Sequence, residues 1–162
     1  MTKSLNEMIE ELLALEKIKI LKAQYCNLID AAIAGDVAKY DKLLAHFIDD
    51  ARVEFVGISI SQGKKAIGEF FKELVHSVFS YASHMVANPV IEVDGHKANG
   101  TWRVLCLATT RKSNQAVWIH GNYEETYLKI ESDWKWESIK FIPDFYTPYD
   151  EGWAKTKMIT LG

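Results

Sequence analysis

The chain has 162 residues and a formal net charge of −3, and 48% of its residues are hydrophobic while 25% are charged. Such a composition is typical of a folded globular protein, and it excludes both a disordered chain and a polycation. Non-specific nucleic-acid binding depends on clustered Lys and Arg, so the weak acidity argues against a nucleic-acid partner. The length predicts one domain over residues 1–162.

The sequence shows no signal for export or for a membrane. Its first residues lack the apolar segment of a signal peptide, and no apolar run approaches the roughly 18 residues that a membrane span needs. The two cysteines, Cys26 and Cys106, are too few for a disulfide scaffold and lack a metal-binding spacing. We therefore expect a cytoplasmic protein with reduced thiols and no membrane partner.

The first half of the chain has mainly helical periodicity. Between residue 5 and about residue 34, apolar residues recur every three or four positions, which predicts an amphipathic helix; they are Met8, Leu12, Leu15, Ile18, Leu21, Tyr25, Leu28 and Ala32. Ser4 or Asn6 could cap this helix, and Gly35 ends it. Shorter helices are predicted over about 36–46 and 64–78, with short strands over 51–57 and 58–62 between them.

Beyond His84 the pattern changes to strands, so we expect this histidine to lie just before the first strand of a curved sheet. Runs over 90–93 and 98–110 flank an Asp-Gly dipeptide, which predicts a hairpin. Pro89 cannot donate to a ladder and marks a strand start or a bulge. Further strands are predicted over 117–130 and 134–142, and Pro143 should end the last one. Helices followed by consecutive antiparallel strands indicate an α+β fold.

Several of these segments, in this order and spacing, resemble the SnoaL-like branch of the NTF2-like superfamily. That branch is close to scytalone dehydratase, the bile-acid 7α-dehydratase and hexachlorocyclohexane dehydrochlorinase. The resemblance extends over about 10–146, and its carriers are the helix 18–30, Gly35-Asp36, the segments 47–53, 84–95 and 121–127, and Trp134. It implies a cone-shaped barrel in which N-terminal helices pack on a strongly curved, mostly antiparallel sheet around an apolar cavity.

In the catalytic relatives a histidine and an aspartate form a dyad at this cavity, and the matching residues here are His84 and Asp30. Several relatives have a tyrosine or lysine where Tyr25 stands. A histidine titrates near neutrality, and a carboxylate bound to one ring nitrogen leaves the other free for proton transfer. The resemblance therefore implies a cofactor-independent lyase or isomerase acting on a hydrophobic, oxygenated small molecule. His84 would be its general base, Asp30 the orienting partner and Tyr25 a hydrogen-bond donor.

Each of these three residues also has a purely structural interpretation. His84 could bond to backbone at a strand start, and Asp30 could be a solvated residue in the last turn of its helix. Tyr25 lies on the apolar stripe and could simply pack in the core. Five residues rotate by about 140° on a helix, so Tyr25 and Asp30 do not share a face.

Residues on the strands are candidate walls of a substrate pocket, and they are Phe55, Trp102, Val104, Cys106, Tyr123 and Phe145, with Trp118 as a further candidate. An aromatic stripe serves equally well as a core. We interpret Cys106 as a small apolar wall residue, because nothing nearby in the sequence would activate its thiol. By strand parity, His120 should point away from the cavity. No metal or nucleotide motif is present, so we expect no cofactor.

The sequence departs from its relatives at three positions. Cys106 stands where the bile-acid enzyme has an aspartate, Pro143-Asp144 where that enzyme has an arginine, and Phe55 where scytalone dehydratase has a tyrosine. These departures favour an alternative function, a non-catalytic small-ligand-binding or assembly module on the same fold. A third possibility is a subunit of a larger assembly, like the small β subunits of ring-hydroxylating dioxygenases.

The resemblance also bears on oligomeric state. Members of this fold often form a homodimer or homotrimer through the outer face of the sheet. Apolar residues that would point outward here and permit such a contact are Leu105, Leu107 and Trp118 or Ile119.

Overall fold

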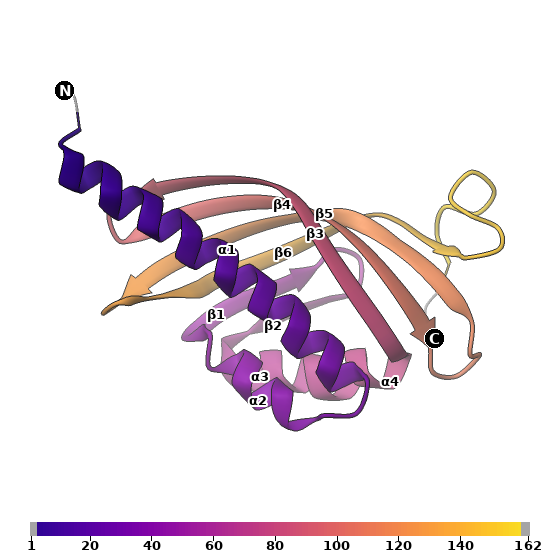
Figure 1. The fold of residues 1–162 in the computed structure, drawn as a ribbon. Helices are drawn as coiled ribbons and strands as arrows, with labels where there is room; N and C mark the ends of the chain where they lie inside the picture. Colours follow the sequence, from indigo (N-terminus) through magenta and orange to yellow (C-terminus); the bar gives the residue numbers. More distant parts are fainter. Residues whose placement is uncertain (1–2, 160–162) are drawn as a thin grey trace.

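The computed structural model describes residues 3–159, in which helices pack against one six-stranded sheet (Figure 1). The first half contains α1 (Leu5–Ile33), α2 (Ala38–Leu44), β1 (Phe47–Phe55), β2 (Ser59–Gln62), α3 (Gly63–Glu69), the π-helical turn η1 (Phe70–Val75) and α4 (His76–Val78). The second half contains β3 (Phe79–Asp94), β4 (Lys97–Thr110), β5 (Ala116–Ile130) and β6 (Asp133–Pro148). None of the helices within residues 3–159 combines the length and the apolar character of a membrane span.

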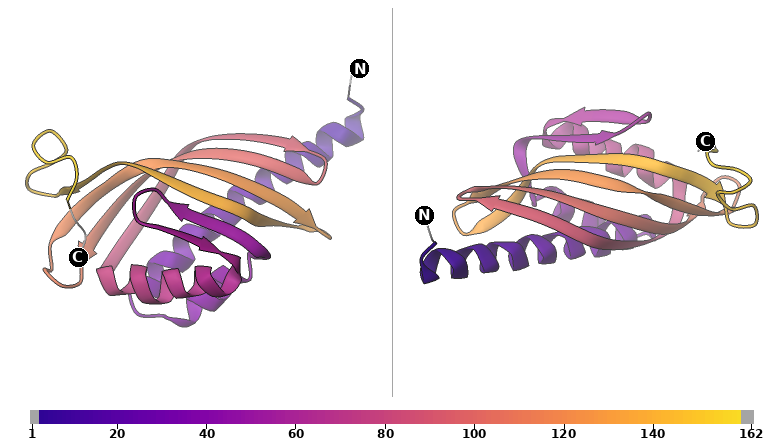
Figure 2. Two further views of the ribbon diagram at one scale, coloured as in Figure 1. Left: turned by 180° about the vertical axis from the view of Figure 1, so that it is seen from behind. Right: turned by 90° about the horizontal axis from the view of Figure 1, so that it is seen from above.

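The sheet has the strand order β2-β1-β6-β5-β4-β3, and only the β1–β6 pair is parallel. Its four long strands are strongly curved, with α1 running across one face and the helical segment from α3 to α4 lying below (Figures 1 and 2). The predicted α+β class is confirmed. The main core fills the space between α1 and the face of the sheet that the helices cover.

Helix α1 begins as predicted but buries only part of the expected stripe. Ser4 caps it in a reciprocal capping box with Glu7. Its C-terminal part is buried through Ile18, Leu21, Tyr25 and their neighbours, whereas Met8 and Leu12 are 44% and 62% exposed. The reason is positional, since the N-terminal turns extend beyond the ends of the strands (Figure 2).

Two strands begin earlier than the sequence pattern predicted. Strand β1 starts at Phe47 rather than at residue 51, so Asp49 and Asp50 lie inside a strand. Strand β3 starts at Phe79, so His84 lies within a strand and not before one. In both cases the strand extends through residues that the sequence pattern left outside a strand, and its first residue, Phe47 or Phe79, has a partner on a neighbouring strand.

Pro89 and Pro143 mark irregular pairing instead of strand ends. Strand β6 continues through Pro143 to Pro148, and its register with β5 shifts opposite Gly121. Pro89 follows a residue with positive φ, Asn88, where the β3–β4 register also shifts. A bulge needs no ladder hydrogen bond from its extra residue and therefore accepts proline. The predicted strand end at Pro143 is wrong. At Pro89 the sequence predicted either a strand start or a bulge, and the structure has a bulge.

The segment after β6 folds back onto the sheet. The backbone N–H of Tyr146 donates to the carbonyl of Lys157 at 3.0 Å, and the N–H of Ile159 donates to the carbonyl of Tyr146 at 3.0 Å. Trp153 stacks on Phe145 with ring centroids 5.2 Å apart. Part of the segment after β6 is thus packed against that strand.

Candidate active site

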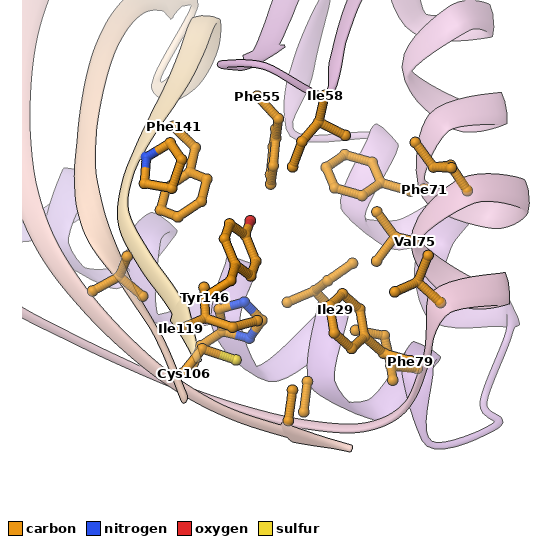
Figure 3. A pocket seen from close by; sticks show the side chains of 18 of the residues that line it. Ile29, Phe55, Ile58, Phe71, Val75, Phe79, Cys106, Ile119, Phe141 and Tyr146 are labelled. Atoms are coloured by element: carbon orange, nitrogen blue, oxygen red, sulfur yellow. The ribbon is translucent and has the colours of Figure 1, made fainter. Parts of the chain in front are cut away.

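A cavity of about 450 Å³ lies between the concave face of the sheet, the C-terminal part of α1 and the helical segment from α3 to α4 (Figure 3). Most of its walls are aliphatic or aromatic, and they include Ile29, Phe55, Ile58, Phe71, Val75, Phe79, Ile119 and Phe141. Four polar side chains, Tyr25, His84, Tyr123 and Tyr146, also line it, together with the thiol of Cys106. A largely apolar cavity with a few polar groups is typical of a small-molecule site.

His84 and Asp30 meet at the cavity although they are 54 residues apart in the chain. Nδ1 of His84 lies 2.5 Å from Oδ1 of Asp30, and the backbone N–H of His84 donates to Oδ2 at 2.9 Å. Their side chains are only 14% and 24% exposed. The carboxylate thus orients the ring and leaves Nε2 as the nitrogen that can serve a ligand. The contact is shown, whereas the catalytic roles of the two residues stay a prediction.

The surroundings of His84 favour its protonated form. Burial disfavours the imidazolium and lowers its pKa, but the charge of Cys106, the hydrogen bond to Asp30 and the charge of Asp30 together outweigh burial. The pKa of His84 is raised to about 10. At neutral pH the resting pair is therefore an imidazolium beside a carboxylate, which can give a proton to a ligand before it takes one.

Tyr25 and Tyr123 line the cavity next to this pair. The Tyr25 ring packs edge-on to the rings of His84, at 6.5 Å between centroids, and of Tyr123, at 6.3 Å. Burial raises the pKa of both phenols well above the ordinary value, so both hydroxyls stay protonated and can donate. Tyr25 and Asp30 face different directions on α1, as expected: Tyr25 lines the cavity, and Asp30 is connected to it only through His84.

A fully buried ion pair beneath the tyrosines was missed from the sequence. Nζ of Lys22 donates to Oε1 of Glu125, and it lies 3.5 Å from the centroid of the Tyr123 ring. Oε2 of Glu125 also accepts from the Tyr127 hydroxyl and, at 3.1 Å, from Nε1 of Trp136. The signal was present, because Lys22 is in helical register with the apolar stripe and Glu125 shares a strand face with Tyr123.

Two of the predicted pocket walls lie elsewhere. Trp102 is buried outside the cavity, where its Nε1 donates to the Tyr127 hydroxyl at 3.1 Å. Phe145 stacks on His120 and Trp153 and does not line the cavity. In the structure Phe145 lies within β6 beyond the register shift, where it pairs with His120, a residue that does not line the cavity.

Four predicted walls do line the cavity, Phe55, Val104, Cys106 and Tyr123, whereas the further candidate Trp118 does not. Ile119 lines it too, so it is not an outward residue.

His120 forms part of a second histidine–aspartate pair outside the cavity. Its Nδ1 lies 2.9 Å from Oδ2 of Asp144, at an angle that does not make a hydrogen bond. The expectation that His120 does not face the cavity agrees with the residues that line it. The chain therefore carries a pair of similar composition that serves as a control for the one in the cavity.

Comparisons with known proteins place this geometry in a family. A family model of the SnoaL-like domain matches residues 10–140. The type 3 hexachlorocyclohexane dehydrochlorinase from Novosphingobium barchaimii is 23% identical, with a TM-score of 0.76 over 86% of this chain and 92% of that one. A Novosphingobium aromaticivorans protein, provisionally assigned as a scytalone dehydratase, is 22% identical, with a TM-score of 0.75 over 86% and 89%.

An NTF2-like superfamily protein from Salmonella enterica serovar Typhimurium is 20% identical, with a TM-score of 0.70 over 85% of this chain and 95% of that one. The search of curated proteins found no match. Likeness at these identities shows the fold, and the predicted NTF2-like architecture is confirmed.

Proposed function

Because the chain belongs to the SnoaL-like domain family, we propose that it is a cofactor-independent lyase or isomerase with a hydrophobic, oxygenated small-molecule substrate. The observation that carries the proposal is the His84–Asp30 pair at an apolar cavity. The dehydrochlorinase and the provisionally assigned dehydratase among its structural neighbours support the same class of reaction.

The raised pKa of His84 sets the order of proton transfers in such an elimination. The imidazolium first gives the Nε2 proton to a leaving hydroxyl, which departs as water. The neutral ring then accepts a proton from the adjacent carbon, a double bond forms, and the imidazolium is restored. Asp30 stabilises the charged ring throughout, and the hydroxyls of Tyr25 or Tyr123 can donate to a substrate oxygen.

The cavity favours a substrate with a compact apolar body. About 450 Å³ of space and largely apolar walls suit a polycyclic or aromatic skeleton. The polar groups gather around His84, so the reacting carbon and its oxygen would lie at that end of the skeleton.

The test is a screen of hydroxylated polyketide-like and steroid-like compounds for loss of water, read by mass spectrometry. His84→Gln should lower turnover by about 10²- to 10⁴-fold, which is the usual contribution of a general acid–base group. His120→Gln changes the similar pair outside the cavity and should leave turnover as in the parent protein. Equal turnover of the His84→Gln variant and the parent would contradict the proposal.

The second candidate is a non-catalytic ligand-binding module. The predominance of apolar side chains around a single polar cluster favours it. In that case a compound from the screen would bind with a similar dissociation constant to the parent and to His84→Gln, and neither protein would convert it.

We also propose a homodimer or homotrimer formed through the outer face of the sheet. Leu105, Leu107 and Trp118 are partly exposed there, and Tyr149 stacks on Trp118 at 5.8 Å between centroids. Light scattering after size-exclusion chromatography tests this, and a monomer at all concentrations would refute it.

A further inference from the structure

The thiol of Cys106 lines the cavity on the strand next to the candidate acid–base histidine, His84. Cys106 on β4 is the register partner of His84 on β3, and directly opposed residues have Cβ atoms roughly 4.5–5.5 Å apart on one face. Both side chains line the cavity, and Figure 3 shows the Cys106 side chain beside Tyr146. The interpretation of Cys106 as an inert wall residue is therefore incomplete.

Cys106, His84 and Asp30 supply the three groups of an activated nucleophile in sequence: a thiol, an imidazole and a carboxylate. Asp30 holds Nδ1 of His84, which leaves Nε2 free. Cys106 acts on the ring as well, because a charge on its sulfur raises the pKa of His84. An adjacent imidazole held by a third group is the arrangement that converts a thiol into a nucleophile.

We propose that Cys106 is a nucleophile that adds reversibly to an electrophilic apolar ligand in the cavity, the chemical class being an α,β-unsaturated ketone. The thiol proton rests on Nε2 of His84, in keeping with the imidazolium of the resting site, so Cys106 reacts as the thiolate and its sulfur electron pair forms a bond to the β-carbon of the ketone. The π electrons move to give an enolate, and the imidazolium returns the proton to the α-carbon. The net change is addition of S–H across C=C, and no oxidant or reductant is needed.

This activity goes beyond the proposed elimination, in which Cys106 takes no part. Its assay is a covalent mass change and does not depend on turnover, so either proposal can fail without the other. The two do share a ligand class, because loss of water next to a ketone produces an α,β-unsaturated ketone.

The second thiol of the chain provides an internal control. Cys26 is also buried, but it does not line the cavity. Burial raises the pKa of Cys26 to about 11, which disfavours its thiolate at neutral pH. The proposal therefore predicts that only one of the two thiols reacts.

The experiment treats the folded protein at pH 7 with cyclohex-2-enone and follows the intact mass, with peptide mapping to locate the adduct. We expect a single adduct on Cys106 in the parent and in Cys26→Ala, and none in Cys106→Ser. His84→Gln should slow the reaction by roughly a hundredfold, because the proton acceptor is lost. Iodoacetamide in guanidinium should label both thiols, which checks that neither is already blocked.

Circular dichroism verifies that each variant is folded, and Asp30→Asn replaces His84→Gln if the latter is not. The proposal is overturned if the parent gives no adduct, if the adduct is on Cys26, or if the histidine or aspartate variant reacts as fast as the parent.

Discussion

Asp30 contacts His84 twice, once at the ring and once at the backbone. One carboxylate oxygen lies 2.5 Å from Nδ1, and the other accepts the main-chain N–H at 2.9 Å. The same side chain therefore orients the imidazole and fastens α1 to β3. A change at Asp30 should affect both the protonation of the site and the stability of the fold.

The first prediction concerns stability and pH. The folded-state pKa of His84 is raised to about 10, so between the unfolded pKa near 6.5 and pH 10 the native state binds the additional proton. The free energy of unfolding should then fall as pH rises, by about 1 kcal/mol per pH unit between roughly pH 7 and 8.5. Urea unfolding at several pH values measures this slope.

Asp30→Asn is the matched variant, because it removes the charge that holds the imidazolium. Its stability should depend less on pH over the same interval. The comparison of the two proteins is needed because Cys26, whose pKa is raised by burial, adds to the slope as pH approaches the ordinary thiol pKa of about 8.5, whereas the buried tyrosines contribute only at higher pH. A parent protein with no slope between pH 7 and 8.5 would show that His84 is neutral in the folded state.

The second prediction concerns the buried ion pair. Lys22 and Glu125 have side chains with 0% exposure, so Lys22→Met leaves an unpaired buried carboxylate and should cost about 3–5 kcal/mol of unfolding free energy. Lys19→Met on the same helix breaks an exposed pair with Glu16 and should cost less than about 0.5 kcal/mol. Denaturant unfolding of both variants makes the comparison.

A double variant separates charge from packing. Lys22→Met with Glu125→Gln removes both charges and keeps an acceptor for the Tyr127 hydroxyl and the Trp136 indole. It should be more stable than Lys22→Met alone. If the double variant is the less stable of the two, the pair matters through packing and not through charge.

The third prediction concerns the bulge between β5 and β6. A Cβ at Gly121 would meet the carbonyl oxygen of Ile142 and lie 2.6 Å from Cε2 of Phe141. Gly121→Ala should therefore cost about 1–3 kcal/mol by overpacking, measured by thermal or urea unfolding. At Gly68 the added Cβ would meet only the flexible end of Leu44, at 3.0 Å, so Gly68→Ala should be close to neutral.

The fourth prediction concerns the cavity. Ala82 lines it and is buried, so Ala82→Phe should occupy ligand space and weaken binding of a compound from the screen by at least about tenfold, or about 1.4 kcal/mol. Ala87, exposed on the same strand, gives the control Ala87→Phe. Ligand-induced shifts in melting temperature compare the two, and equal shifts would place the ligand outside this cavity.

The sequence was sufficient for the fold and for the contact between His84 and Asp30. The helical stripe of α1 and the alternation in β4 and β5 are strong local signals, and the family pattern joined two distant residues that periodicity alone could not. The position of His84 inside β3 was missed because pairing with β4 depends on a partner strand, and local composition does not report that.

The errors in the pocket walls have a different cause. Phe145 follows the predicted strand end at Pro143, whereas β6 continues past a register shift opposite Gly121 and pairs Phe145 with His120. Trp102 lies on the predicted face of its strand. It is nearer the Lys22–Glu125 end of the core, where it is hydrogen-bonded to Tyr127. The alternation of residues along a strand predicts which face of the sheet a side chain occupies. Whether that side chain reaches the cavity depends on its position along the strand and on how the sheet curves.

The return of the tail onto β6 has a practical consequence for handling the protein. Met158 and Ile159 line the cavity, and Tyr146 holds this segment in place. Proteolytic loss of this segment during purification would therefore remove part of the cavity wall. Figure 1 shows the start of α1 on the opposite side of the molecule, so trimming there would leave the cavity wall intact.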